Sequence, residues 1–299
     1  MADLHVNIAG VNFGNPLIAA SGTFGFGREY SEFYPLSVLG GISCKGITLQ
    51  PRLGNPPPRI AETPAGILNS VGLQNPGVDH FIDKDLPWLK KQNTVVIANI
   101  AGNTEEDYCN MARKLSATDI DMIELNISCP NVKSGGVAFG TSCTSVAHIT
   151  KRVRACCTKP LIVKLSPNVA DIAEIAKAAE SEGADALSLI NTLTGMRIDI
   201  DSRRPVLRNN TGGLSGAAVF PVAVRMVWQT ANAVSIPVIG MGGISSWQDA
   251  VEMLLAGASA LQIGTVLFHD PYAPVKIKEG LCTYPVSYTH LTLPTNSRV

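Results

Sequence analysis

Short apolar runs recur along most of the chain and predict buried strands. Eight such runs, rich in Val, Ile, Leu and Ala, end at or near a Gly, Ser, Asn, Lys or Thr; they cover residues 16–21, 41–46, 94–100, 122–128, 161–166, 186–191, 237–243 and 260–265. Their apolar character is continuous rather than alternating. This pattern is typical of strands in a parallel sheet that is covered on both faces.

Helical patterns separate many of these runs. Residues 171–183 repeat apolar positions with helical spacing and stop at a glycine, and residues 246–257 do the same with Ser245 or Ser246 as the expected N-cap. Eight strands with helical crossovers favour an α/β fold of the (β/α)8 type, a TIM barrel with long active-site loops, over an open doubly wound sheet. We expect a single barrel domain over residues 1–281. No strand is followed by a dinucleotide-binding G-x-G-x-x-G, and residues 22–27 (GTFGFG) are interpreted as a loop.

Two segments depart from the repeating pattern. Residues 48–77 form a long irregular stretch with six prolines, and loops of this length inside a compact domain usually serve a function. Residues 282–299 hold four threonines, two prolines and no acidic residue, and they interrupt a helical pattern that begins near Ala273. We expect this tail to be non-native, from a frameshift or adaptor read-through, or disordered, and it carries no functional argument.

Composition indicates a globular protein that handles small molecules. The 299 residues are 45% hydrophobic and 16% charged, and the formal net charge is zero, so no basic excess points to a nucleic acid or an anionic membrane. No apolar run approaches the roughly 18 residues of a spanning helix, and the N-terminus lacks the features of a secretory signal. Seven cysteines without a C-x-x-C pair argue against a metal or iron–sulfur site and favour free thiols in the cytoplasm.

The residues at the strand ends indicate which chemistry the barrel carries, because reactive groups of such barrels lie there. Histidines and carboxylates are scarce at these positions, which argues against metal-dependent hydrolases and glycosidases. Several Asn amides could hold a planar polar heterocycle, although a single Asn there could equally cap a turn. Two lysines could neutralise a ligand carboxylate and a negatively charged reduced cofactor. The candidates are Ser21, Lys45, Asn99, Asn126, Cys129, Lys164, Asn191, Thr192, Gly242, Gly243, Gly264 and Thr265.

Two of these features allow a more specific interpretation. Cys129 lies on a glycine-containing loop after the fourth strand, where it is either an inert apolar residue or, near lysines, a proton acceptor. The last two strands end in Gly242–Gly243 and Gly264–Thr265, the usual place of a barrel phosphate site, and Gly216 could add a third wall. A phosphorylated cofactor is expected there, and FMN fits a site that contains lysines and amides.

Five motifs together resemble the class 1 dihydroorotate dehydrogenases. They are GILNSVGLQNPG (66–77), ELNISCPNVKSGG (124–136), KLSPN (164–168), NTLTGMRID (191–199) and GMGGI (240–244), and the resemblance extends from the N-terminus to about residue 281. It implies an FMN-binding (β/α)8 barrel that oxidises (S)-dihydroorotate to orotate in de novo pyrimidine (UMP) biosynthesis.

The resemblance also implies roles for individual residues. Cys129 would be the catalytic base that removes the C5 proton while a hydride passes from C6 to N5 of FMN, and Lys164 would lie near N1 of the flavin. No metal is expected. The implied substrate-binding residues are Lys45, Asn69, Ser70, Val71, Gly72, Leu73, Asn126, Asn131, Asn191 and Thr192. The implied FMN-binding residues are Ser21, Lys45, Gly46, Asn99, Asn126, Lys164, Ile190, Gly216, Gly242, Gly243, Gly264 and Thr265.

The sequences of the catalytic and proline-rich loops resemble subtype B more than subtype A. The catalytic subunits of subtype B pair with a second chain. That partner carries FAD and a [2Fe–2S] cluster and passes electrons to NAD+, so the resemblance implies a homodimer within a heterotetramer, with neither nucleic acid nor membrane as a partner. Three alternatives stay open: the fumarate-linked subtype A, a dihydropyrimidine dehydrogenase-like flavin barrel, and an inactive barrel that only binds FMN.

Overall fold

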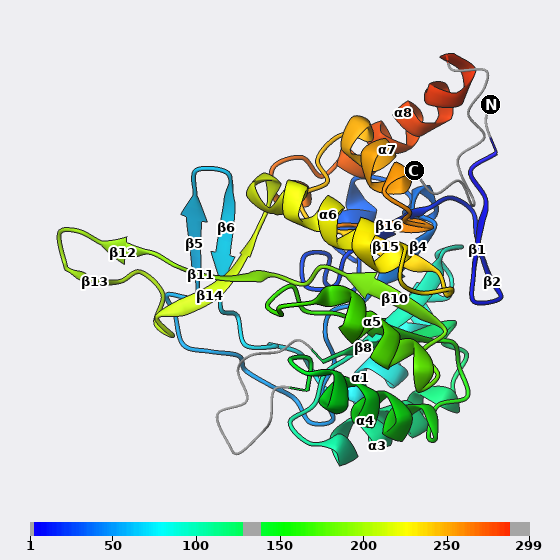
Figure 1. The fold of residues 1–299 in the computed structure, drawn as a ribbon, viewed down its shortest axis with the longest axis horizontal. Helices are drawn as coiled ribbons and strands as arrows, with labels where there is room; N and C mark the ends of the chain where they lie inside the picture. Colours follow the sequence, from blue (N-terminus) through cyan, green and yellow to red (C-terminus); the bar gives the residue numbers. More distant parts are fainter. Residues whose placement is uncertain (1–2, 128–138, 288–299) are drawn as a thin grey trace.

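Eight parallel strands close into a barrel in the computed structural model, which describes residues 3–127 and 139–287 (Figure 1). The closed barrel confirms the predicted (β/α)8 class, and each of the eight apolar runs contributes one strand. In order around the barrel the strands are β3 (Leu17–Ala19), β4 (Gly41–Ser43), β7 (Val95–Ile100), β8 (Met122–Asn126), β9 (Leu161–Lys164), β10 (Ala186–Leu189), β15 (Val238–Met241) and β16 (Ala260–Ile263).

Helices cover the outside of the barrel. Ser246 caps α7 through a reciprocal pair of hydrogen bonds with Asp249, as predicted, and Thr104 and Asp107 do the same for α3. Two 3-10 turns, η1 (Tyr30–Glu32) and η2 (Leu36–Val38), take the place of a helix between β3 and β4. The helical elements that follow are α1 (Val78–His80), the π-helical turn η3 (Phe81–Asp85), α2 (Leu86–Leu89), α3 (Glu105–Ser116), α4 (Cys143–Arg154), α5 (Ile172–Ser181), η4 (Ala217–Val219), α6 (Phe220–Ala231), α7 (Trp247–Leu255), η5 (Thr265–Phe268) and α8 (Ala273–Ser287).

The interior of the barrel is filled by layers of side chains from alternate strands, as close packing of a (β/α)8 barrel requires. At the amino-terminal end, the hairpin of β1 (Val6–Ile8) and β2 (Val11–Phe13) closes the barrel with two fully buried side chains. Above it lies an isoleucine layer from the first, third, fifth and seventh strands. Its members, Ile18, Ile97, Ile162 and Ile239, are all fully buried.

The next layer is polar and comes from the second, fourth, sixth and eighth strands. We call it the polar layer; it consists of Ser43, Glu124, Ser188 and Gln262, none more than 1% exposed. Hydrogen bonds from the other three side chains all end on the Glu124 carboxylate. This layer separates the apolar half of the barrel from its carboxyl-terminal mouth.

A second sheet covers the mouth, and part of it corrects the sequence prediction. Within residues 48–77, predicted to be irregular, β5 (Ile60–Thr63) and β6 (Gly66–Asn69) form an antiparallel hairpin. This hairpin joins β14 (Thr211–Ser215) and β11 (Leu193–Met196) in a four-stranded sheet, which we call the roof sheet. The pairing buries Ala61 and Leu68 against Leu207, and the hairpin forms because a distant segment supplies that apolar surface. A further hairpin, β12 (Ile198–Asp199) and β13 (Arg204–Pro205), extends away from the barrel (Figure 1).

The last helix continues past the expected end of the domain. Helix α8 covers Ala273–Ser287, so the division expected after Leu281 falls inside a helix, with Leu281 buried and the ring of Tyr284 6.0 Å from that of Trp247. Residues 288–299, most of the expected tail, lie outside the described residues. Among the helices of the described ranges, none is both long enough and apolar enough to cross a membrane.

Candidate active site

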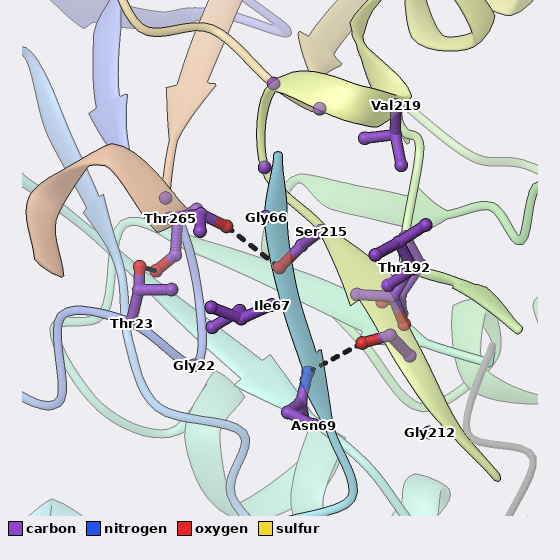
Figure 2. A pocket seen from close by; sticks show the side chains of 18 of the residues that line it. Gly22, Thr23, Gly66, Ile67, Asn69, Thr192, Gly212, Ser215, Val219 and Thr265 are labelled. Carbon is purple, nitrogen blue, oxygen red and sulfur yellow. Dashed lines mark hydrogen bonds between the residues drawn. The ribbon is translucent and has the colours of Figure 1, made fainter. Parts of the chain in front are cut away.

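A cavity of about 650 Å³ lies between the mouth of the barrel and the roof sheet. Its walls combine residues that follow the barrel strands with residues from β6 and β14 of the roof sheet (Figure 2). Cavities of this size and position are the usual binding sites of (β/α)8 barrels. The geometry of the two uppermost barrel layers determines which ligand the cavity can accept.

These two layers continue the alternation seen deeper in the barrel. Two residues above the isoleucine layer lie Ala20, Asn99, Lys164 and Met241, and two residues above the polar layer lie Lys45, Asn126, Ile190 and Gly264. Asn99 is fully buried and Lys164 only 4% exposed, although both are polar. All of these residues except Asn99 line the cavity, and Asn99 lies beneath Asn126, which donates a hydrogen bond to it.

A chain of side-chain amides leads from the polar layer to the rim of the cavity. Asn99 Nδ2 donates to Glu124 Oε2 (2.5 Å), and Asn126 Nδ2 donates to Asn99 Oδ1 (3.4 Å). Asn191 Nδ2 donates in turn to Asn126 Oδ1 (3.2 Å), and the backbone N–H of Thr192 donates to Asn191 Oδ1 (2.8 Å). We call Asn99, Asn126 and Asn191 the amide chain. Every amide in it has the same direction, with its NH2 group toward the barrel interior.

Lys45 brings a second ammonium to the cavity. It follows β4, and its backbone N–H donates to the carbonyl of Gly25 (2.9 Å), which ties the strand end to the loop after β3. Burial lowers the pKa of Lys45 and the nearby charge of Arg59 lowers it further. A ligand carboxylate beside Lys45 would offset both effects, because a nearby negative charge favours the ammonium form.

The opposite end of the cavity is built from glycines around the start of α6. Gly216, Gly242 and Gly243 all have left-handed backbone angles, with φ of +109°, +123° and +78°. A Cβ at Gly216 would lie 2.5 Å from the Cα of Gly66, and one at Gly243 would lie 2.7 Å from the Cβ of Phe220. We call these three residues the glycine cradle. Only glycine allows the chain to approach this closely, and the approach brings backbone N–H groups to the cavity wall.

The start of α6 beside this cradle has no side-chain cap. Neither Gly216, the N-cap of η4, nor Val219, the N-cap of α6, supplies a side-chain acceptor to the helix. The backbone N–H groups of Ala218, Val219 and Phe220 donate to main-chain carbonyls, so the positive end of the helix dipole is what favours an anion here. Thr265 and Ser215 add hydroxyl groups near this end, joined by a hydrogen bond of 2.9 Å (Figure 2).

The roof sheet contributes polar groups from the other side. Asn69 on β6 donates to the carbonyl of Gly213 on β14 (3.4 Å), and both residues line the cavity (Figure 2). A Cβ at Gly213 would lie 2.0 Å from Oγ1 of Thr192, so this glycine lets the loop after β10 lie against the roof sheet. The segment Ser70, Val71, Gly72 and Leu73 continues the wall.

These observations fit a ligand with a phosphate and a polar ring, as expected for FMN. The glycine cradle and the start of α6 suit a phosphate, and the amides and lysines suit a polar ring. Gln262 Oε1 is a further indication, since it is buried at the floor of the cavity without a hydrogen-bond partner among the described residues. A buried acceptor of this kind is satisfied by a donor on a bound ligand.

The structure brings nearly all residues suggested by the sequence to this one cavity. All substrate and cofactor candidates within the described ranges line it apart from Asn99. Cys129 and Asn131 lie outside the described residues, so their roles remain predictions. The roles of the others also remain predictions, since a position on a cavity wall does not define a function.

Several residues of the site were missed by sequence reasoning. Glu124 and Gln262 lie one layer below the strand ends, so a search limited to the last residue of each strand does not find them. The period of two along a barrel strand could have identified them. The roof sheet brought Ile60, Thr63, Gly66, Ile67, Thr194, Gly212 and Gly213 to the cavity through pairing between distant segments, for which the sequence carries no local signal.

The fold and the cavity define a (β/α)8-barrel protein with one candidate ligand site between the mouth of its barrel and the roof sheet. The family model of dihydroorotate dehydrogenase matches residues 3–284. The chain therefore belongs to the dihydroorotate dehydrogenase family, which confirms the resemblance of its motifs.

Curated relatives agree with this membership, and a solved structure has the same fold. The chain is 57% identical over 287 residues to a dihydroorotate dehydrogenase B (NAD(+)) catalytic subunit from Alkaliphilus metalliredigens, covering 96% of this chain and 95% of that protein. It is 57% identical over 285 residues to the protein of the same name from Bacteroides thetaiotaomicron, covering 95% and 94%. The fold matches the DHODH of Eimeria tenella, solved in complex with ferulenol, with a TM-score of 0.80 at 23% identity over 99% of this chain and 88% of that one.

Proposed function

We propose that the chain is the catalytic subunit of an NAD+-linked dihydroorotate dehydrogenase, which oxidises (S)-dihydroorotate to orotate in pyrimidine (UMP) biosynthesis. The observation that carries the proposal is that one cavity is lined by two members of the amide chain, by two lysines and, at its opposite end, by the glycine cradle. Orotate is a flat ring with donors, acceptors and a carboxylate, and such a site matches each of these groups.

In this proposal the residues of the cavity divide into two groups. The glycine cradle, with Gly264 and Thr265, would hold the phosphate of one FMN, and Lys164 would lie near N1 of its ring. Bound FMN supplies the acceptor for two electrons. Asn69, Asn126, Asn191 and Asn131 hold the edges of the substrate ring, Lys45 binds its carboxylate, and Thr192 and residues 70–73 enclose it.

Cys129 is proposed as the base that accepts the C5 proton at its Sγ atom. In the sequence it follows Asn126, the last residue of β8, by three positions, and the reactive groups of (β/α)8 barrels come from residues that follow the strands. A thiolate is suited to this role when cations stabilise it, and two lysines line the cavity.

An anaerobic absorbance spectrum tests the proposal directly. The purified chain should be yellow, and added dihydroorotate should bleach the flavin band. Cys129→Ser should keep its FMN and lose most of the bleaching rate at neutral pH, because a hydroxyl accepts a proton far less readily than a thiolate. Cys143→Ser, which changes an exposed free cysteine at the start of α4, is the matched control and should behave as wild type. Normal bleaching in Cys129→Ser would overturn the assignment of the base, and a chain that binds FMN without bleaching would be an inactive barrel.

The proposed route for the electrons uses a partner subunit with FAD and a [2Fe–2S] cluster, in a heterotetramer built on a homodimer of this chain in the cytoplasm. The 57% identity to catalytic subunits named for NAD(+) supports this route. The chain alone should then reduce neither NAD+ nor fumarate with dihydroorotate, and adding the partner should restore NAD+ reduction. Turnover with fumarate alone would instead favour the subtype A enzyme, and activity on dihydropyrimidines without the carboxylate would favour the dihydropyrimidine dehydrogenase-like alternative.

A further inference from the structure

Glu124 is an unusual residue to find at the centre of a barrel. It lies on β8, is fully buried, and sits directly above the isoleucine layer. A carboxylate in such a place is costly unless several partners compensate for its loss of water. Its retention in the polar layer therefore calls for a role that a neutral side chain would not fill.

Four hydrogen bonds satisfy the carboxylate. Oε1 accepts from Ser188 Oγ and from Gln262 Nε2, each at 2.7 Å. Oε2 accepts from Ser43 Oγ (2.7 Å) and from Asn99 Nδ2 (2.5 Å), and Lys164 Nζ lies 4.0 Å from the same oxygen. Burial alone would raise the pKa of Glu124, but the charge of Lys164 and the hydrogen bonds outweigh burial and hold it below its usual value. Glu124 is therefore ionised and acts only as an acceptor.

An acceptor at this point determines the direction of the amide chain. Asn99 must turn its NH2 group toward Glu124, so its Oδ1 faces Asn126. Asn126 must then donate to Asn99 and present its own Oδ1 to Asn191. The pattern of donors and acceptors at the cavity therefore follows from a charge one layer below it.

The same carboxylate also compensates the ammonium at the floor of the cavity. Lys164 is 4% exposed, and Glu124 is the only carboxylate that an ion pair within 4.0 Å joins to it among the described residues. Glu124 thus sets the net charge on the barrel side of the cavity, where the ring of FMN lies in the proposed function.

We propose that Glu124 is a positioning residue, which compensates the buried Lys164 ammonium and sets the direction of the amide chain that faces the ligand. This inference rests on the proposed function for the identity of the ligands. The charge pairing and the amide direction each have their own test.

The charge pairing is tested by a double-variant cycle with Glu124→Gln and Lys164→Met. The glutamine keeps the shape of the side chain. Gln262, whose Oε1 has no hydrogen-bond partner among the residues that the structure describes, can turn its amide to accept from the new NH2 group. Lys164→Met leaves a buried carboxylate without its cation, which is strongly unfavourable. The double variant has neither charge, so we expect its urea unfolding midpoint to lie above that of Lys164→Met. A double variant no more stable than Lys164→Met would overturn the pairing.

The effect of the pair on the cavity is tested by the midpoint potential of bound FMN. Removing the negative charge in Glu124→Gln leaves the site more positive, so the anionic reduced flavin is favoured and the potential should rise. The rise should largely disappear in the double variant, because removing the Lys164 ammonium as well restores the net charge of the pair. Glu174→Gln, which breaks an exposed pair with Lys177 (2.8 Å), is the matched control and should change neither measurement. An unchanged potential in Glu124→Gln would overturn this part of the proposal.

The direction of the amide chain is tested by comparing Glu124→Gln with Glu124→Met. The glutamine still offers an acceptor to Asn99, whereas the methionine offers none and releases the chain. Orotate binding, measured by titration calorimetry, should stay within a few-fold of wild type in Glu124→Gln and weaken by roughly tenfold or more in Glu124→Met, the loss expected when a buried partner is wrongly oriented. Equal binding by the two variants would overturn the role in the amide chain.

These readouts separate failure of the inference from failure of the proposed function. The unfolding cycle needs no ligand, so it tests the pairing even if orotate is not the substrate. A wild-type chain that binds FMN but not orotate would overturn the proposed function and the amide role together, and the potential would still test the charge pairing. If Glu124→Gln alone does not fold, recovery of the fold in the double variant supports the pairing, and its absence overturns it.

Discussion

Gly243→Ala tests whether the glycine cradle depends on close approach of the backbone. Gly243 has φ of +78°, and a Cβ there would lie 2.7 Å from the Cβ of Phe220 and 2.9 Å from the carbonyl oxygen of Gly216. The left-handed conformation costs an alanine about 1–2 kcal/mol. The two forced overlaps with backbone-anchored atoms add about 1–3 kcal/mol, since neither neighbour is the flexible end of a side chain. We therefore expect a loss of about 2–5 kcal/mol in the free energy of unfolding.

Gly10→Ala is the matched control, because it carries the same backbone strain without the overlaps. Gly10 lies in the turn between β1 and β2, at the opposite end of the barrel, with φ of +85° and no heavy atom within 4 Å of an added Cβ. Its expected loss is the conformational part alone, about 1–2 kcal/mol. Both variants are measured by urea unfolding, with and without added FMN, and by quenching of flavin fluorescence on binding.

The two variants should differ in both measurements. Gly243→Ala should lose about 1–3 kcal/mol more stability than Gly10→Ala, and any part of the overlap relieved by moving the cradle should appear as weaker FMN binding, tenfold for each 1.4 kcal/mol. Equal losses of stability combined with wild-type FMN affinity in Gly243→Ala would refute the argument from close approach.

Three further predictions follow from the barrel layers and their charges. Burial and the charge of Arg59 lower the pKa of Lys45, so orotate binding should weaken as the pH rises toward 10.5. Lys45→Arg should bind orotate with constant affinity over that range. An equal loss of affinity in wild type and Lys45→Arg, measured by calorimetry, would contradict this. The lowered pKa of Glu124 stabilises the fold fully above about pH 4.5, and this stabilisation is lost as the pH falls through the folded-state pKa. In urea unfolding at acid pH, Glu124→Gln should not show this loss of stability. Ile239→Ala should lower the free energy of unfolding by about 2–5 kcal/mol, because it leaves a cavity in the fully buried isoleucine layer. Ile198→Ala, at an exposed position, should change it by less than about 0.5 kcal/mol, and equal effects in thermal unfolding would refute the layer packing.

The barrel could be predicted because each of its strands is a continuous apolar run. In a parallel barrel one face of each strand packs against helices and the other fills the interior, so the chain carries no polar face to interrupt the run. Because the apolar runs are continuous, the sequence does not show which of their residues face the interior of the barrel. Ile97 and Val96 look alike in the sequence, yet Ile97 belongs to the isoleucine layer inside the barrel, while Val96 packs in the larger core cluster.

The roof sheet could not be predicted for a different reason. Its strands have at most five residues, and the register that pairs Leu68 with Leu214 joins segments that lie on either side of four barrel strands in the chain. Gly212 and Gly213 on β14 have poor intrinsic preference for a strand, and they are retained because Asn69 and Thr192 approach them closely. Tertiary contact, rather than local preference, creates this sheet.

The residues of the candidate site were likewise predictable only in part. Lys45, Asn126, Lys164 and Asn191 were predicted because they end or follow strands, where a barrel places its reactive groups. The role of Glu124 was not, because in the sequence it is one acidic residue inside an apolar run.

Barrel geometry nevertheless determines which side chains surround a buried residue at that depth. Inward side chains alternate between odd and even strands, so a residue one layer below the mouth on β8 faces the upper residues of β7 and β9 rather than those of its own strand. Those residues are Asn99 and Lys164, which are the two polar groups that Glu124 contacts in the layer above it. Glu124, two residues before the end of β8, therefore acts through residues at or next to the ends of the strands on either side.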